Sequence, residues 1–378
     1  MTAGRDLRAA RAQPWRDVAA LLDPAGRCAD PLATGRPLDW YAIYAVAAAN
    51  WVAPTLYAEL ARSPQRWHAV PADVQQALAE LHRLNESRNA RLREALRRTV
   101  QCLAAAGIEA LLLKGAIALL PGQYPNAGAR IVGDLDIALQ NADVERAAEV
   151  LMEAGYRVAD DVDDPWFYDH LHHLPPLVDP SGQVCIELHR EVLVPGASAR
   201  ALPLAVMRQD AQPFDWDGLR VWLPALPHRL LHNILHDAVQ DGAYRSGYRS
   251  LRQLLELARL REEPGAAALD WAALLVHLEK LGLGAATTAQ LEVSRQLFAQ
   301  ALPPGVHAGR AATGSAQRFW LWIERPGLWP YYKAARRVRQ LARNACTPLW
   351  YPAKWRQLGR IWTAARKRDG GALGKLVG

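Results

Sequence analysis

Residues 114–139, KGAIALLPGQYPNAGARIVGDLDIAL, include an apolar strand pattern over 130–139 that carries Asp134 and Asp136. Side chains two residues apart on a strand project from the same face, with Cα atoms about 7 Å apart. Two carboxylates this close repel each other and lose hydration when buried, so they need a cation between them. Mg²⁺ or Mn²⁺ suits this position, because a hard ion takes oxygen ligands and leaves sites open for phosphates. A solvent-facing pair on an edge strand is the alternative.

The residues around these two acids favour a phosphate site. Lys114 and Gly115 follow an apolar strand pattern over 108–113 and open a flexible connection, where an ammonium and backbone amides can approach a polyphosphate. Arg130 can hold phosphate oxygens in a bidentate fork, and Gly133 removes side-chain bulk beside the acids. Only six of the 45 basic residues are Lys, so a lysine here departs from the habit of this chain.

A predicted hairpin supplies a third carboxylate. Residues 172–178 and 183–190 flank Asp-Pro-Ser-Gly, whose Pro and Gly suit a tight reversal. Apolar residues in the second strand alternate with Glu187 and His189, which therefore share one face. Glu187 can join the two aspartates, and His189 can steady that carboxylate or accept a proton.

This order of elements resembles the DNA polymerase β type nucleotidyltransferases: a Gly-containing turn after a strand, Asp-x-Asp on the next strand, and one carboxylate on a later strand. Within that superfamily, LLLKGAIALL, YPNAGARIVGDLDIAL and CIELHREV look like an uncharacterised bacterial nucleotidyltransferase family with the signature Leu-Lys-Gly, Tyr-Pro, Arg-x-x-x-Asp-x-Asp and Glu-Leu-His. The resemblance covers 108–193 and extends more weakly through LPHRLLHNILHDAV and LRQLLELARL. The superfamily's usual Gly-Ser is Gly115-Ala116 here.

The resemblance implies an α+β fold with a polymerase β-like core, a small mixed sheet with helices. It also implies transfer of a nucleoside monophosphate from an NTP, with ATP expected, to a small molecule, peptide or protein, with release of pyrophosphate. Asp134 and Asp136 would ligate two Mg²⁺ or Mn²⁺ ions about 3.5–4 Å apart, and Glu187 the ion that activates the acceptor hydroxyl. The implied nucleotide-binding residues are Lys114, Gly115, Arg130 and Gly133.

Hydrophobic periodicity places helices on both sides of this core. It predicts helices over 39–62 and 71–106, one from Asn141 to Ala154, and further helices from 226 onward. A weak strand is expected over 156–160. We expect four regions: an N-terminal helical region, 1–84; the nucleotidyltransferase core, 85–224; a C-terminal helical region, 225–324; and a basic, aromatic-rich tail, 325–378.

The positive charge is concentrated in the tail. Residues 325–378 carry 13 Lys or Arg and one acid, a net charge of +12, which leaves −5 for residues 1–324. The tail can stack on nucleic acid, lie on an anionic membrane surface, or pack on the body and dock a peptide. A catalytically idle protein that binds a peptide, protein or nucleic-acid partner through this tail is therefore an alternative function. The interleaved tryptophans are Trp329, Trp350, Trp355 and Trp362.

Histidines provide a second alternative. His232 and His236 lie four residues apart on a predicted helix, and Asp237 follows, as in a His-Asp metal phosphohydrolase. Matching ligands on other helices are not evident, so we expect both histidines either to face the cleft or to cap contacts between helices. Histidines that face the cleft could orient the base or acceptor. Two further groups are expected in loops near the site or in solvent: His170, His172 and His173, and the acidic run Asp160, Asp161, Asp163 and Asp164.

The sequence shows no pattern of membrane spans, signal peptides or paired cysteines. No window has the length of a membrane span and no signal-peptide pattern opens the chain, which predicts a cytoplasmic protein without integral membrane association. The cysteines have no CxxC spacing, so neither a zinc cage nor a disulfide framework is indicated. They are Cys28, Cys102, Cys185 and Cys346.

Overall fold

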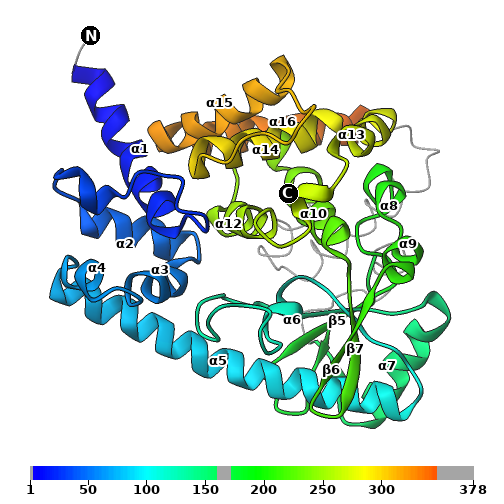
Figure 1. Ribbon diagram of the computed structural model, residues 1–378. Helices are drawn as coiled ribbons and strands as arrows, with labels where there is room; N and C mark the ends of the chain where they lie inside the picture. Colours follow the sequence, from blue (N-terminus) through cyan, green and yellow to red (C-terminus); the bar gives the residue numbers. More distant parts are fainter. Residues whose placement is uncertain (1–2, 160–171, 347–378) are drawn as a thin grey trace, which may run out of the picture. The chain divides into compact units, whose positions relative to one another are not determined.

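The computed structural model describes residues 3–159 and 172–346 (Figure 1). The chain forms two units, residues 1–320 and 321–378, and each is treated by itself. The first unit contains a seven-stranded sheet between helices. The described part of the second unit consists of the end of one helix, a short 3₁₀ turn and the helix α16, Trp329–Cys346.

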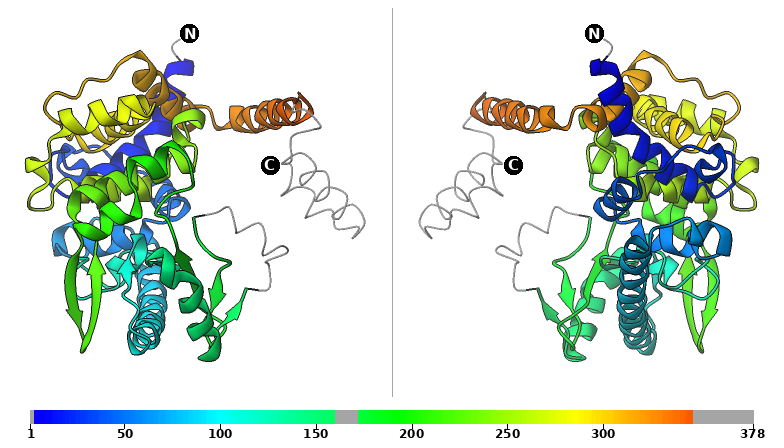
Figure 2. Two further views of the ribbon diagram at one scale, coloured as in Figure 1. Left: turned by 90° about the vertical axis from the view of Figure 1, so that its right-hand side faces the viewer. Right: turned by 90° about the vertical axis from the view of Figure 1, so that its left-hand side faces the viewer.

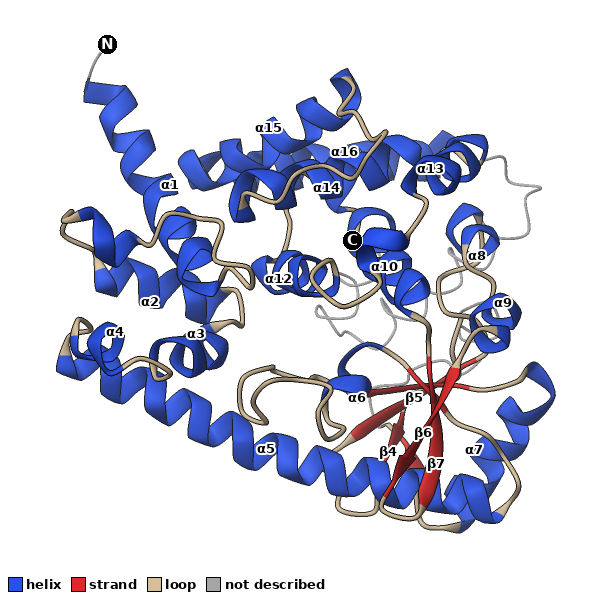
Figure 3. Cartoon of the chain, in the orientation of Figure 1, coloured by secondary structure: helices blue, strands red, loops and turns tan. Residues whose placement is uncertain are grey.

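The sheet has the strand order β3-β4-β5-β2-β1-β7-β6 (Figure 3). Two neighbouring pairs are parallel, β2 with β5 and β1 with β7, and the other neighbours are antiparallel. The strands are β1 Leu111–Leu112, β2 Leu135–Ala138, β3 Arg157–Val158, β4 Leu177–Val178, β5 Cys185–His189, β6 Gln212–Trp216 and β7 Leu219–Leu223.

The N-terminal helices differ from the prediction at two places. The helix predicted over 71–106 is confirmed, whereas the one predicted over 39–62 is two helices that break at Trp51. A continuous helix would bring the ring of Pro54 against the carbonyl of Asn50, so the second helix starts afresh. The polar start of the chain also forms a helix. These helices are α1 Ala3–Leu22, α2 Trp40–Ala49, α3 Ala53–Leu60, α4 Pro64–His68 and α5 Ala72–Ala105.

The remaining helices of the first unit follow the strands or lie between them. The chain turns helical after β7, as the periodicity predicts. A π-helical turn, His236–Gln240, extends α10. The helices are α6 Lys114–Ala118, α7 Val144–Glu153, α8 Ala197–Ala201, α9 Leu204–Gln209, α10 Leu226–Leu235, α11 Ala243–Ser246, α12 Leu251–Leu260, α13 Trp271–Lys280, α14 Gly284–Phe298 and α15 Arg310–Glu324, whose end belongs to the second unit, with 3₁₀ turns at Pro31–Thr34, Asn141–Asp143 and Ala266–Ala268. The 3₁₀ turn of the second unit is Pro326–Leu328.

The sheet is packed on both faces, because its side chains alternate along each strand. Leu112 and Ile137 belong to a core cluster with residues of α5 and α7. Leu111 and Ala138 belong to a second cluster with residues of α9, α10 and α12. Figure 2 shows α5 along its axis, beside the strands that it covers. Asp136 precedes Ile137 on β2, so its side chain lies on the second face, toward the C-terminal helices.

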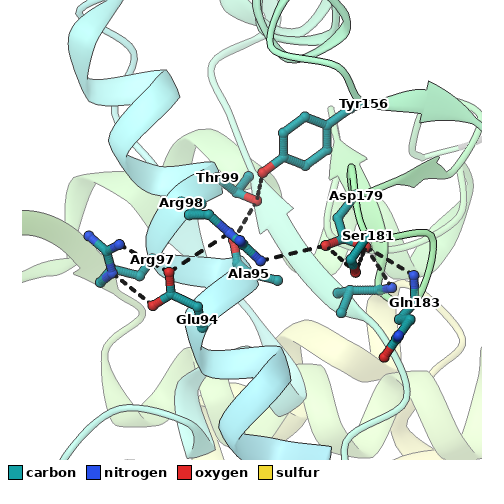
Figure 4. A network of polar contacts seen from close by, with 10 residues as sticks. Glu94, Ala95, Arg97, Arg98, Thr99, Tyr156, Asp179, Ser181 and Gln183 are labelled. Carbon is teal, nitrogen blue, oxygen red and sulfur yellow. Dashed lines mark hydrogen bonds and ion pairs between the residues drawn. The ribbon is translucent and has the colours of Figure 1, made fainter.

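Polar contacts join the predicted hairpin, which is confirmed, to α5 (Figure 4). Asp179 in the turn accepts the N–H of Val184 at 3.0 Å and lies 3.8 Å from a guanidinium nitrogen of Arg98. The hydroxyls of Thr99 and Tyr156 are 2.9 Å apart. These contacts hold β5 in place, and β5 carries two of the candidate site residues.

Three local features depart from the sequence prediction. The mixed α+β fold class is as expected, and helices make up 59% of the structure. The first departure is that β2 begins only at Leu135, whereas the strand was predicted from residue 130. The flexible connection predicted after Lys114 is instead the short helix α6. The β6–β7 hairpin was not predicted, although Asp217 and Gly218, with φ of 49° and 77°, form the two-residue Asp-Gly turn that favours hairpins.

Candidate active site

The parallel pairing of β2 with β5 brings acids from distant parts of the chain together. Asp136 lies opposite Glu187, and Ala138 lies opposite His189. His189 Nε2 is 2.9 Å from Asp136 Oδ1 and 3.5 Å from Glu187 Oε2. The three side chains each offer a ligand atom, all within 4.8 Å of one another. We refer to Asp136, Glu187 and His189 as the acid–histidine group.

Lys114 completes the charge balance of this group. It lies two residues after the end of β1 and has a left-handed φ of 46°, a conformation that strains a non-glycine residue and is common at functional sites. The N–H of Leu113 donates to the Asp136 carbonyl at 3.0 Å, which aligns the two segments. The ammonium of Lys114 then lies 2.7 Å from Asp136 Oδ1.

The charges of the group keep its carboxylates ionised. Burial alone would raise the pKa of Asp136, but the charge of Lys114 and the hydrogen bond from His189 hold it far below its usual range. Burial also opposes ionisation of Glu187, yet the His189 hydrogen bond lowers the pKa of that carboxyl. Conversely, burial disfavours a charged His189, while its bonds to Asp136 and Glu187 raise its pKa. Ionised carboxylates are the form that ligates a cation.

Asp134 stands directly before β2, half-buried beside the group. Burial, followed by the charges of Asp136 and Glu187, raises the pKa of Asp134 to about 6. A crowded carboxyl of this kind is one that added positive charge would ionise. Asp134 and Asp136 line the same pocket, so the structure brings together the two acids selected from the sequence.

The donor set fits a hard divalent ion. Asp136 Oδ2 is buried and has no hydrogen-bond partner among the described residues. Two carboxylates and an imidazole, with a third carboxylate close by, match the oxygen-rich ligands of Mg²⁺ and the mixed oxygen and nitrogen ligands of Mn²⁺. Asp136 and Glu187 would hold such an ion, joined by His189 once its ring has lost its proton, and Asp134 would contribute its charge.

A pocket lined by basic side chains opens next to the acids. Its walls come from residues 113–118, the loop 123–134 and the helices α10 and α12. Arg130 lines it and is paired through Nε with Glu256 Oε2 at 3.1 Å. His232 and His236 also line it, the first of the two arrangements expected for them, with ring centroids 6.0 Å apart. Neither belongs to the acid–histidine group. The four cations on the wall are Lys114, Arg130, Arg229 and Arg252.

The loop before β2 is held by side chains instead of by strand partners, which explains the late start of that strand. On α5, Asn85 and Asn89 both donate to the Arg130 carbonyl, and Arg88 donates to the carbonyls of residues 132 and 133. Every carbonyl from 127 to 133 accepts such a bond. The donors are Asn89 to Ala127, Asn85 to Gly128, Thr55 to Ala129, Asn85 and Asn89 to Arg130, Arg252 to Ile131, and Arg88 to Val132 and Gly133.

The two candidate glycines have different surroundings. A Cβ on Gly115 would lie 2.7 Å from Val132 Cγ1 and 3.1 Å from a guanidinium nitrogen of Arg130, so α6 approaches this loop closely only with glycine here. A Cβ on Gly133 would meet no atom within 4 Å. Gly133 therefore borders open space beside the acids.

Comparison with known proteins adds one decisive observation. A model of a family described as uncharacterised nucleotidyltransferase matches residues 36–299. The chain belongs to this family. The resemblance that the motifs indicated is thereby confirmed, and the whole wall of this pocket, from Leu113 to Leu260, lies inside the matched region. Searches of curated proteins and of solved structures gave no match.

Other residues selected from the sequence lie nearby or outside the described part of the chain. The rings of His172 and His173 pack 5.2 and 5.3 Å from that of His189. No helix in the described ranges is long and apolar enough to cross a membrane. The following selected residues fall outside the described residues: Asp160, Asp161, Asp163, Asp164, His170, Trp350, Trp355 and Trp362.

Sequence reasoning did not select Arg252, Asn85 or Asn89. The asparagines sit at helical spacing among leucines on α5, and both are buried. A polar residue on an apolar helix face is the available signal, because such a side chain must find a hydrogen-bond partner. The sequence does not predict which group is the hydrogen-bond partner, because the loop that accepts these bonds lies some 40 residues further along the chain.

Proposed function

We propose that the protein is a metal-dependent nucleotidyltransferase with a polymerase β-like core, which transfers a nucleoside monophosphate from an NTP, with ATP expected, to an acceptor hydroxyl. The observation that carries this proposal is the acid–histidine group beside a pocket with four basic side chains, in a chain of a nucleotidyltransferase family. Acids that hold a cation and bases that hold polyphosphate are the two requirements of phosphoryl chemistry.

The proposed reaction replaces one phosphorus–oxygen bond by another. The acceptor oxygen bonds to the α-phosphorus, the bond from that phosphorus to the bridging oxygen breaks, pyrophosphate leaves, and the acceptor proton passes to solvent. Bound Mg²⁺ or Mn²⁺ would stabilise negative charge on the attacking and leaving oxygens. Asp136, Glu187 and His189 would position the reacting groups through the cation that they would hold, and Asp134 would add its charge beside it.

The basic residues would neutralise the negative charge of the triphosphate. Lys114 lies against Asp136, so its ammonium is placed to neutralise the phosphate that reacts. Arg130 faces the pocket and would hold phosphate oxygens further from the acids. Both act by position and charge, which is where most of the rate enhancement in phosphoryl transfer arises. The acceptor is proposed to be a small hydroxylated molecule, a peptide or a protein side chain.

The test measures transfer and nucleotide binding together. Purified protein is incubated with Mg²⁺ or Mn²⁺, α-labelled ATP, GTP, CTP or UTP, and a panel of hydroxylated metabolites, peptides and proteins. We expect labelled product from the wild type and from Asp215→Ala, which changes an exposed acid on β6. The double variant Asp134→Ala, Asp136→Ala should give none.

Two results would contradict the proposal in different ways. A wild-type protein that neither binds an NTP nor transfers label would rule out the activity. Transfer that survives the double substitution would leave the activity intact and refute the assignment of the acids.

A further inference from the structure

The four basic side chains on the pocket wall differ in whether each forms an ion pair with a carboxylate. A half-buried charge without a counter-ion is unfavourable, because it loses hydration that no partner replaces. Of the four, Arg252 has no carboxylate oxygen within 4.0 Å among the described residues. The other three are paired: Lys114 with Asp136 at 2.7 Å, Arg130 with Glu256 at 3.1 Å, and Arg229 with Glu263 at 2.8 Å.

Arg252 is nevertheless held in a definite position. One guanidinium nitrogen donates to the Ile131 carbonyl at 3.2 Å, and the guanidinium lies over the ring of Trp51, 5.1 Å from its centroid. The N–H of Leu251 donates to Asn50 Oδ1 at 3.4 Å, which ties the start of α12 to the turn that carries the tryptophan. An aromatic face and one carbonyl thus orient the guanidinium, and its other N–H groups have no hydrogen-bond partner among residues 3–159 and 172–346.

The backbone at Trp51 places the indole beside α12. Its left-handed φ of 62° ends α2: the N–H of Trp51 donates to the Ala48 carbonyl at 3.1 Å and that of Val52 to the Ala47 carbonyl at 2.9 Å, the bonds typical of a helix C-terminus. Trp51 remains 52% exposed, and its ring lies under the guanidinium of Arg252.

We propose that Arg252, oriented by Trp51, binds the two phosphates that leave as pyrophosphate. This inference rests on the proposed function and names a further binding residue for it. Lys114 touches Asp136 and so belongs with the reacting phosphate, whereas Arg252 is anchored on Ile131, outside the acid–histidine group. Burial and the charge of Arg130 lower the pKa of Arg252 despite the opposing charges of Asp134, Glu256 and Asp241, and a bound polyphosphate would add negative charge beside the guanidinium.

The test measures binding of ATP, AMP and inorganic pyrophosphate, each with Mg²⁺, by titration calorimetry. Arg252→Gln should weaken ATP and pyrophosphate binding at least tenfold and leave AMP binding unchanged, because AMP lacks the two phosphates concerned. Arg252→Lys should give an intermediate loss, since it keeps the charge but not the planar fork. Trp51→Leu should weaken pyrophosphate binding several-fold, and Trp51→Phe should largely restore it.

Arg259→Gln is the matched control. Arg259 also lies on α12 and over an aromatic ring, 4.9 Å from the centroid of Tyr124, but it is paired with Glu59. This variant should bind pyrophosphate as the wild type does, and thermal melting of all variants identifies any that do not fold. If Arg252→Gln folds and binds pyrophosphate with wild-type affinity, the inference is wrong and the proposed function stands. If the wild type binds neither ATP nor pyrophosphate, both fail.

Discussion

Asp136 is 1% exposed, and its two oxygens have different surroundings. Oδ1 accepts hydrogen bonds from both Lys114 and His189, while Oδ2 has no partner in the described part of the chain. A buried carboxylate is costly unless cations balance it, and a second unsatisfied oxygen adds to that cost. The arrangement is consistent with a residue selected for ligand binding at the expense of stability.

Replacing Asp136 should therefore weaken cation binding directly. In Asp136→Asn the charge is lost while the shape is kept, so we expect Mn²⁺ affinity, followed by electron paramagnetic resonance, to fall at least tenfold. Asp215→Asn, an exposed acid on β6, serves as the control. Equal Mn²⁺ affinity in wild type and Asp136→Asn would show that the ion binds elsewhere.

A second buried acid, Asp237 in the π-helical turn, should make stability depend on pH. Burial raises its pKa from 3.8 to about 6, so the folded state holds this proton more tightly than the unfolded state. Its contribution is therefore most favourable below pH 4 and is lost as the pH rises from about 4 to 6, a loss on the order of 3 kcal/mol.

Asp237→Asn removes this titration and retains an acceptor for Gln290, which donates to the carboxylate. Urea unfolding between pH 4 and pH 7 should show the variant gaining stability relative to the wild type as the pH rises. A stability difference that does not change across this range would contradict the assignment.

At the scale of elements, α5 makes two kinds of contact along its length, apolar packing on the sheet and hydrogen bonds to a loop. Its C-terminal half packs apolar residues such as Leu96 and Leu103 on the sheet, while its middle turns Asn85 and Asn89 toward the loop before β2. One helix thereby connects the core to the pocket wall. Both contacts require length, and α5, with 34 residues, is longer than the other described helices.

The polar part of α5 can be tested at Asn89. The substitution Asn89→Leu keeps the branching and the number of side-chain heavy atoms but leaves the Ala127 carbonyl without its donor, which should lower the free energy of unfolding by about 1–3 kcal/mol. Denaturant unfolding measures the change. Ala90→Leu, at an exposed neighbouring position, should have little effect. An equal loss in both variants would assign the effect to leucine and not to the hydrogen bond.

The start of α6 makes a complementary prediction. Gly115→Ala places a methyl group 2.7 Å from Val132 Cγ1, so we expect loss of stability and weaker ATP binding as the loop moves. Gly133→Ala meets no atom within 4 Å and should unfold at the same denaturant concentration as the wild type. Calorimetric ATP titration and denaturant unfolding of both variants provide the comparison. A fully stable Gly115→Ala variant would contradict the close-approach argument.

At the scale of the whole molecule, the family match and the pocket both lie within the first unit. The sequence division into regions at 84, 224 and 324 remains a proposal, and its last boundary can be tested. A chain that ends at Glu324 should unfold at the same temperature as the full-length protein and keep its ATP affinity. A large drop in either quantity would show that the basic second unit supports the first.

Local sequence patterns predicted most of the site residues, but they did not predict how those residues come together in space. Apolar alternation around Asp136 and Glu187 predicted their strands and the face that each acid occupies, because side-chain direction on a strand depends only on position. The strand predicted over 130–139 was too long, since its first part finds side-chain donors on α5 instead of a neighbouring strand. Propensity carries no information about such a partner.

The sequence by itself determined the family of this protein and supplied the candidate site residues: three acids and a lysine after a strand. Tertiary structure alone decided that β2 and β5 pair so that Asp136 meets Glu187, and that Arg252 joins the pocket wall with no ion-pair partner among the residues that the structure describes. The physical reason is separation along the chain. Contacts between residues fifty to two hundred positions apart depend on how whole helices and strands pack, which no local pattern records.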